Sequence, residues 1–356
     1  MIGIRLPLFT SRRCGSATRV AERRSPALLW QLLAVLAASP FIFAGTSNAN
    51  TDDPAPDEIS FFGESVSSLN QWPRSAAWGI SYRKIIAPYF ATSLAYLNDG
   101  HFPGHHRDGV TAEAWLPINL FSQHVTVSVG AGPFYYYDTV VASNSGNYAD
   151  SHGWAWMYSL DATWQFRGDR TGPFIEMRLD HTAPARSIET TSIGLGIGYR
   201  GFSDIHNTAD PNAAEGFATN ELAAYYWKTV VNSFTSQTSP AEEFEYRRQI
   251  WNELRASVGF LNEGNAQLIR RDGFIAEFWA EPSFDSGLWS IGAGFGGYSA
   301  IDKYRAEPGR HVSEVVSATV SVRPLKNLDI RFLWHRIVTD YSRDTDVVLW
   351  GLGYRF

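Results

Sequence analysis

The end of the chain alternates strictly between two kinds of side chain. In a β-strand successive side chains point to opposite faces, so such a pattern predicts a strand with one apolar face and one small or polar face. A near copy occupies 193–200, which closes the first half of the chain. The fold is therefore constrained to be all-β. The apolar set at the end is Val348, Trp350, Leu352, Tyr354 and Phe356, and between them lie Leu349, Gly351, Gly353 and Arg355.

The same alternation divides each half into eight segments. The clearest is 154–166, whose period of two is incompatible with an amphipathic helix. Sixteen antiparallel strands connected up and down are therefore predicted. In the first half they are expected near 58–66, 76–85, 88–97, 109–117, 123–137, 152–166, 172–181 and 190–200, and in the second near 219–230, 242–251, 253–261, 273–282, 288–300, 313–323, 327–338 and 346–356.

An internal repeat relates the two halves. Segments of the first half recur 164 positions later with the same spacing between them, which indicates a duplication. We divide the chain into 1–49, a first barrel half 50–201, a periplasmic connection 202–217 and a second barrel half 218–356. The matched sets are 96–100 with 260–264, 107–109 with 271–273, Glu113 with Glu277, Trp115 with Trp279, and, at a slightly shorter offset, 128–132 with 290–294.

Composition favours a membrane barrel. Aromatic residues make up 14% of the chain, yet its mean hydropathy is −0.20, as expected when one face of each strand meets lipid and the other meets water. The final strand, which ends on Phe356, resembles the C-terminal signal of bacterial outer-membrane proteins. The resemblance implies a Gram-negative outer-membrane β-barrel with both termini in the periplasm. Its partners would be outer-membrane lipid, lipopolysaccharide and the barrel-assembly machinery.

The first 49 residues predict a secretory signal peptide. Six Arg precede an apolar run from Pro26 to Ala44, and Ser47 and Ala49 are small residues suited to a cleavage site. Removal of this segment leaves 24 Lys plus Arg against 35 Asp plus Glu, a net charge of −11. No basic face remains for nucleic acid. Cys14, the only cysteine, lies inside the leader, so the exported form has no thiol.

Two architectures fit the duplicated strands. A single barrel of about sixteen strands would enclose a lumen wide enough for water or a solute, whereas two tandem eight-stranded barrels would each be filled by their own side chains. We favour the single barrel, because two barrels would have extra strand ends to close and the connection shows no domain-like composition.

The polar face carries charges of both signs and should face the lumen, because a charged Arg or Lys on the lipid face costs about 2–4 kcal/mol at the midplane. Because both signs are interleaved, we interpret the charges themselves as a structural salt-bridge network, with a selectivity-setting pore lining as the alternative, in which Trp115 and Trp279 offer flat surfaces for a sugar. The doubled barrel and its charged interior together still favour a channel or envelope component that passes a hydrophilic solute or an exported glycan. A loop-displaying surface or structural barrel is the alternative function. The predicted lumen residues are Arg83, Glu113, Trp115, Asp161, Glu176, Arg178, Asp180, Arg247, Glu277, Trp279, Arg331 and His335.

Residues at the end of the first half match part of a catalytic pattern. The run 173–176, then His181, then 187–189, resembles the PagL-type lipid A deacylases of the outer membrane. The resemblance implies an eight-stranded barrel with a Ser-His-Glu triad on its outer face, in which His181 and Glu189 would be the base and the acid. The nucleophile position, however, is Ala183, and without a serine the triad fails at its first step. An esterase would need Thr182 or Ser187 instead, so we favour a protein without catalytic residues.

The predicted loop between the third and fourth strands contains His101, His105 and His106, residues that suit Zn²⁺ or Cu²⁺. The duplicate loop, 265–272, has no histidine. We therefore expect a polar surface loop, with no metal and no cofactor.

Overall fold

The computed structural model describes residues 57–201 and 220–356, apart from short gaps at 69–70, 88, 103, 121–123, 142–147, 167–170, 185–186, 234–235, 252, 267–268, 285–286 and 305–309. The expected signal peptide 1–49 and connection 202–217 lie outside these residues. Throughout the described parts the regular structure is β-strand. Among them there is no helix with the length and apolarity needed to cross a membrane.

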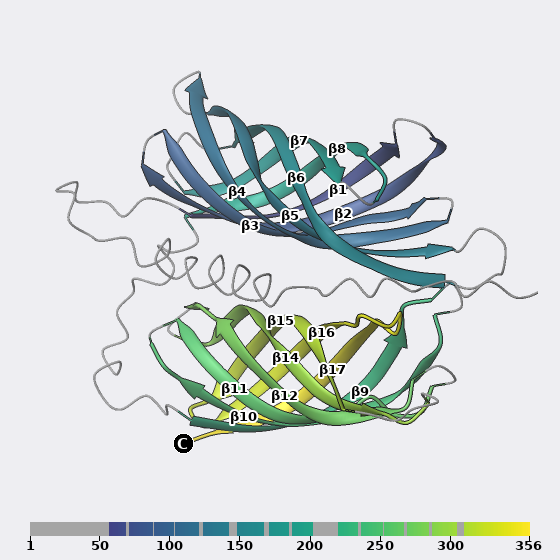
Figure 1. Cartoon of the computed structure of the whole chain (residues 1–356). Coiled ribbons are helices and arrows are strands. Elements are labelled where there is room, and N and C mark those ends of the chain that lie inside the picture. Colours follow the sequence, from purple (N-terminus) through teal and green to yellow (C-terminus); the bar gives the residue numbers. More distant parts are fainter. Residues whose placement is uncertain are drawn as a thin grey trace, which may run out of the picture. The chain divides into compact units, whose positions relative to one another are not determined.

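The first half of the chain forms a closed eight-stranded barrel, here called barrel 1 (purple to teal in Figure 1). Each strand pairs antiparallel with the next, and β8 returns to β1, with rungs from Glu58–Arg200 to Ser68–Thr190. The strands are β1 Asp57–Ser68, β2 Gln71–Ala87, β3 Phe90–Phe102, β4 His105–Leu120, β5 Val125–Val141, β6 Tyr148–Gln165, β7 Gly172–Pro184 and β8 Thr190–Arg200.

The second half forms its own closed barrel, here called barrel 2 (green to yellow in Figure 1). Strand β17 pairs with β9, and β12 pairs with β14 beyond the two-residue β13. The strands are β9 Asn220–Val231, β10 Thr238–Gln249, β11 Leu254–Asn262, β12 Arg271–Ala280, β13 Ser283–Phe284, β14 Trp289–Asp302, β15 Arg310–Leu325, β16 Leu328–Val338 and β17 Thr345–Arg355.

The all-β prediction of two eight-strand repeats is confirmed, but the favoured single barrel is wrong. In a single sixteen-stranded barrel β8 would pair with β9, whereas each of these strands pairs within its own half. The objection that two barrels have more ends to close does not hold, because the first and last strands of each half satisfy one another's backbone hydrogen bonds. The lumen is therefore the narrow interior of an eight-stranded barrel, which side chains can fill.

The last strand of each barrel shows why the alternation was so regular. On β8 the apolar Ile193, Leu195 and Ile197 point outward and are exposed, as lipid-facing residues must be. The glycines between them leave space for large inward side chains: a Cβ added at Gly196 would lie 2.6 Å from a carboxylate oxygen of Glu176. Small residues on the last strand thus accommodate large ones on its neighbours.

The two barrels repeat one another in backbone detail. Gly100 and Gly264 both have a φ of 76°, and the amide of each donates to the Asn side chain two residues earlier, at 3.0 and 2.9 Å. The equivalence at an offset of 164 continues into β5 and β14, where Gly130 lies opposite Trp115 and Gly294 opposite Trp279. The match of 128–132 with 290–294 was therefore displaced by two residues.

Candidate functional site

The centre of barrel 1 is built around Trp115 on β4. Its side chain is fully buried, and its indole nitrogen donates to the hydroxyl of Ser93 on β3 at 2.8 Å. The guanidinium carbon of Arg83 lies 4.0 Å from the ring centre and that of Arg178 lies 5.2 Å away. Arg178 donates to Glu113 at 2.9 Å and to Asp180 at 2.7 Å. Ring and charges together occupy the interior.

Barrel 2 repeats this arrangement. Trp279 on β12 donates to the Ser257 hydroxyl at 2.9 Å, and Arg247 lies 4.2 Å from its ring centre. Arg247 also pairs with Glu245 at 2.9 Å and with Glu281 at 2.7 Å. The stacked indole and guanidinium are therefore a shared element of both halves.

Further ion pairs surround this element in barrel 2. Arg331 contacts Glu281 at 3.0 Å and both Glu221 and Asp329 at 3.2 Å. His335 lies 2.9 Å from Glu243, and its other ring nitrogen lies 2.6 Å from the hydroxyl of Ser317. This second group has the composition of a Ser-His-Glu triad, but its histidine is fully buried and the serine hydroxyl also donates to Glu277. It is a structural network, because no substrate can reach it.

All twelve predicted lumen residues are buried, and none exposes more than 7% of its surface. Most of the charged ones contact a neighbour of opposite sign, as Arg83 contacts Asp161. The two tryptophans, whose rings were expected to offer a surface for a sugar, are covered by guanidiniums and expose at most 1%. A lumen continuous with water would leave such side chains exposed.

Sequence reasoning missed one arginine in each barrel, Arg107 and Arg271, at the end of the barrel where β7 turns into β8 or β16 into β17. Arg107 pairs with Asp99 at 2.6 Å, donates to Thr182 at 2.9 Å, and contacts the carbonyl of Ile188 and the hydroxyl of Thr190. It therefore ties the β7–β8 hairpin to the opposite wall.

Its duplicate, Arg271, pairs with Glu263 and reaches the carbonyl of Arg343 and the hydroxyl of Thr345, both at 3.1 Å. It ties the β16–β17 hairpin in the same way. The sequence signal is the Arg-Asp-Gly that recurs at 107–109 and 271–273.

The outer wall of barrel 1 brings His181 and Glu189 together. The Nε2 atom of His181 lies 3.2 Å from Glu189, and its Nδ1 atom lies 2.9 Å from the hydroxyl of Thr191 on β8. His181 and Thr191 are direct neighbours across the β7–β8 ladder. The side chains of His181 and Glu189 are 35% and 46% exposed. A hydroxyl, an imidazole and a carboxylate thus lie in contact on an accessible surface.

The two hydroxyls considered as substitutes for the missing serine are not available. Thr182 points into the barrel, where it contacts Arg107 and Thr190. Ser187 donates to Asp138 at 2.7 Å. Thr191 is the residue that contacts His181, and sequence reasoning missed it because it belongs to the next strand.

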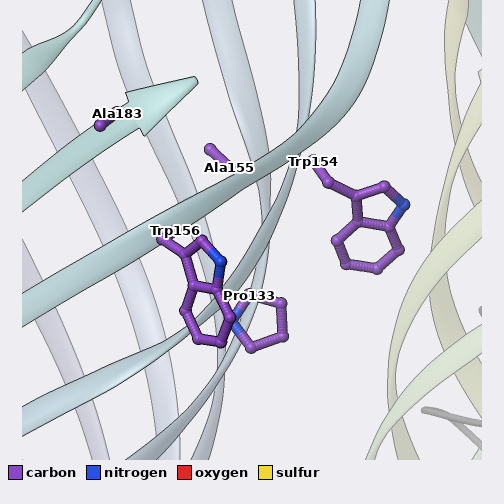
Figure 2. Close-up of a pocket in the computed structure, with 5 residues that line it drawn as sticks. All are labelled: Pro133, Trp154, Ala155, Trp156 and Ala183. Atoms are coloured by element: carbon purple, nitrogen blue, oxygen red, sulfur yellow. The ribbon is translucent and has the colours of Figure 1, made fainter. Parts of the chain in front are cut away.

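A shallow groove of about 390 Å³ lies on the same wall (Figure 2). Its lining residues are apolar: Trp154, Ala155 and Trp156 follow one another on β6, with Pro133 of β5 and Ala183 of β7 beside them. Ala183 is two residues from His181 and faces the same side of the sheet, about 7 Å along the strand. An acyl chain is the kind of molecule that such a lining accommodates.

The histidines near the tip of the β3–β4 hairpin belong to extended strands. His105 lies 2.8 Å from Asp138, and His101 stacks on His106 with ring centres 4.2 Å apart. Within the described residues there is no group of three or more side chains placed to hold a metal ion.

Two closed barrels with an apolar outer wall and a charged interior define an outer-membrane β-barrel protein, because a closed barrel leaves no unpaired backbone group in lipid. No protein-family model matches the chain. No curated protein matches it either.

Solved structures similar to the chain include three barrels. The N-terminal β-barrel domain of Pseudomonas aeruginosa OprF is 17% identical, with a TM-score of 0.33, and the match covers 41% of this chain and 98% of that one. The attachment invasion locus protein Ail of Yersinia pestis is 13% identical over 42% and 99%, with a TM-score of 0.31. Neisserial surface protein A is 14% identical over 41% and 94%, also with a TM-score of 0.31.

Proposed function

We propose that the chain is a non-conducting outer-membrane protein, in which two sealed barrels support an outer wall and two extracellular ends where its function lies. The observation that carries this is the filled interior of both barrels. In each one a buried tryptophan is covered by an arginine that is itself paired with carboxylates.

This proposal differs from the channel that the sequence favoured. A pore for a glycan or another hydrophilic solute needs a continuous column of water, and the side chains expected to line it are almost inaccessible. Interleaved charges of both signs also attract one another across a narrow lumen rather than a passing ion. The loop-displaying or structural alternative therefore gains support.

The test is a conductance measurement on the mature chain in planar bilayers, beside a general porin as positive control. We expect no stepwise current. The matched variant is Arg247→Ala with Trp279→Ala, which removes the buried stack of barrel 2 and should admit ions; Trp350→Ala, on the outer wall, should not. A steady current from the unaltered chain would restore the channel.

A second candidate function is an acyl esterase on the outer wall of barrel 1. It is favoured by the contacts of His181 with Thr191 and Glu189 beside an apolar groove. In this scheme the Thr191 hydroxyl attacks an ester carbonyl while His181 takes its proton, and the same proton goes to the departing alcohol. Water then hydrolyses the acyl-threonine and releases a fatty acid.

Acyl release from lipopolysaccharide by the purified chain tests this candidate. His181→Ala and Thr191→Val should both abolish release, and Ser187→Ala should not, because that hydroxyl is bonded to Asp138 instead. Absence of release from the unaltered chain, with folding verified by its heat-sensitive migration on gels, removes the esterase.

A further inference from the structure

Two oppositely charged side chains break the apolar pattern of the outer walls. Asp108 on β4 of barrel 1 and Arg336 on β16 of barrel 2 both point away from their own lumen. Both are nevertheless buried, exposing 2% and 1%. A charge on the outside of a membrane barrel must find a partner or remain uncompensated in lipid.

The partner of each lies on the other barrel. The guanidinium of Arg336 is 3.2 Å from Asp108, and it also pairs with Asp346 of its own barrel at 3.1 Å. Asp108 in turn accepts a 2.7 Å hydrogen bond from Tyr96. The result is a chain of four polar groups that crosses from one wall to the other.

Aromatic contacts extend this region. Tyr135 of β5 donates to Glu314 of β15 at 3.0 Å. The rings of Tyr96 and Trp334 meet edge to face with centres 5.1 Å apart. Tyr135 also shares a buried cluster with Val338 of β16. Polar heads and apolar bodies of these side chains are thus both in contact with the other barrel.

A second group of contacts lies at the strand ends. The amide of Asp344 donates to Asp150 at 3.1 Å, and the amide of Asp150 donates to Ser342 at 3.3 Å. His152 lies 3.6 Å from Asp344. These contacts join the start of β6 to the loop that precedes β17.

The repeat shows that these contacts are specific to one pair of walls. At an offset of 164, Tyr96 corresponds to Phe260, which has no hydroxyl. Asp108 corresponds to Asp272, which pairs with Lys303 within barrel 2. The duplicated positions have therefore diverged, and only one copy is suited to meet the other barrel.

We propose that barrels 1 and 2 dock against each other in the membrane through this seam, formed by Tyr96, Asp108 and Tyr135 on one side and Glu314, Trp334 and Arg336 on the other. The chain then acts as a covalently linked pair of barrels with one fixed contact face. The proposal does not depend on whether either barrel conducts.

Cross-linking tests the proposal in the full chain. The mature chain has no cysteine of its own, so Tyr135→Cys with Glu314→Cys introduces the only thiols. After treatment in membranes with a short flexible bismaleimide, a protease site placed within 202–219 is cut. We expect the two halves to migrate together on a denaturing gel. The matched control, Leu195→Cys with Val258→Cys, uses two exposed outer-wall positions and should separate.

Two outcomes would overturn the seam: separation of the halves in the Tyr135–Glu314 pair, or a product with the mass of two chains, which would mean that the faces join different copies. A charge exchange gives an independent readout. Asp108→Arg and Arg336→Asp should each lower the cross-linking yield several-fold, and the double variant should recover most of it. Equal yields in all four forms would contradict the role of the ion pair.

Discussion

The guanidinium carbon of Arg247 lies 4.2 Å from the ring centre of Trp279, and the equivalent pair in the first barrel, Arg83 and Trp115, is separated by 4.0 Å. Each barrel thus has its own stacked guanidinium and indole, at equivalent positions of its interior. A buried guanidinium over an indole gains from cation–π attraction, about 2 kcal/mol when desolvated, and from the carboxylates that pair with its edges. The stack occupies the interior of the barrel and stabilises it through the same contacts.

The glycine opposite each tryptophan should be intolerant of a side chain. A Cβ at Gly130 or Gly294 would lie 2.7 Å from ring carbons of Trp115 or Trp279. Because both rings are enclosed, Gly130→Ala and Gly294→Ala should each destabilise the fold by about 1–3 kcal/mol. Urea unfolding in lipid vesicles measures this. Gly63→Ala is the control, since nothing lies within 4 Å of its added Cβ; an equal effect of all three would contradict the argument.

Glu281 should be the most sensitive carboxylate of barrel 2. It accepts from Arg247 at 2.7 Å and from Arg331 at 3.0 Å, and both guanidiniums are buried. Glu281→Gln removes the charge that compensates them, which costs about 3–5 kcal/mol when a buried pair loses one partner. Glu242→Gln, on the exposed outer side of β10, should change the urea midpoint little. If the two variants unfold alike, the buried network is not a source of stability.

Substitution of Arg107 or Arg271 should have a local effect. Arg107→Ala should raise hydrogen exchange in the β7–β8 hairpin and leave the β16–β17 hairpin unchanged, because its contacts with Thr182 and Thr190 lie in barrel 1. Arg271→Ala should do the reverse through Thr345. Arg248→Ala, an exposed arginine, is the control. If hydrogen exchange rises equally in both hairpins, the arginines act on global stability rather than on the hairpin that each one contacts.

Much of this fold was predictable because period-two alternation depends only on which face each side chain occupies. The inward positions of Trp115, Arg178 and His335 followed directly from it. Which strands close each barrel did not follow from the alternation, because backbone hydrogen bonds do not depend on the side chains. Strand β8 offers the same hydrogen bonds to β1 as to β9.

The contacts of His181 on the outer wall show a second limit of prediction from the sequence. The resemblance to the PagL-type deacylases pairs His181 with Glu189. Thr191 contacts the same histidine from across the ladder, and its role depends on register, which side-chain alternation alone does not determine. The roles of Arg107 and Arg271 were missed for a related reason, because the hairpin that each one contacts, β7–β8 or β16–β17, lies more than 70 residues further along the chain.

The contacts between β6 and the loop before β17 should weaken as the pH rises. Strand β6 has 18 residues, more than the 9–11 needed to cross a membrane, so its first residues project beyond the bilayer. Burial, together with the charge of Asp344, raises the pKa of Asp150 to about 7, and burial raises the pKa of Asp344 to about 6.

Both pKa values lie above the usual 3.8, so the folded loop holds protons that the unfolded one would release. This contribution to stability is complete below about pH 4 and is lost as the pH passes through 6 to 7. His152 also faces Asp344, at 3.6 Å. Nearby Arg336 keeps its charge throughout. Hydrogen exchange at Thr339 and Asp344, corrected for its intrinsic pH dependence, should therefore be faster at pH 7.5 than at pH 5. In Asp150→Asn with Asp344→Asn this difference should largely disappear, and its persistence there would assign the effect to other groups.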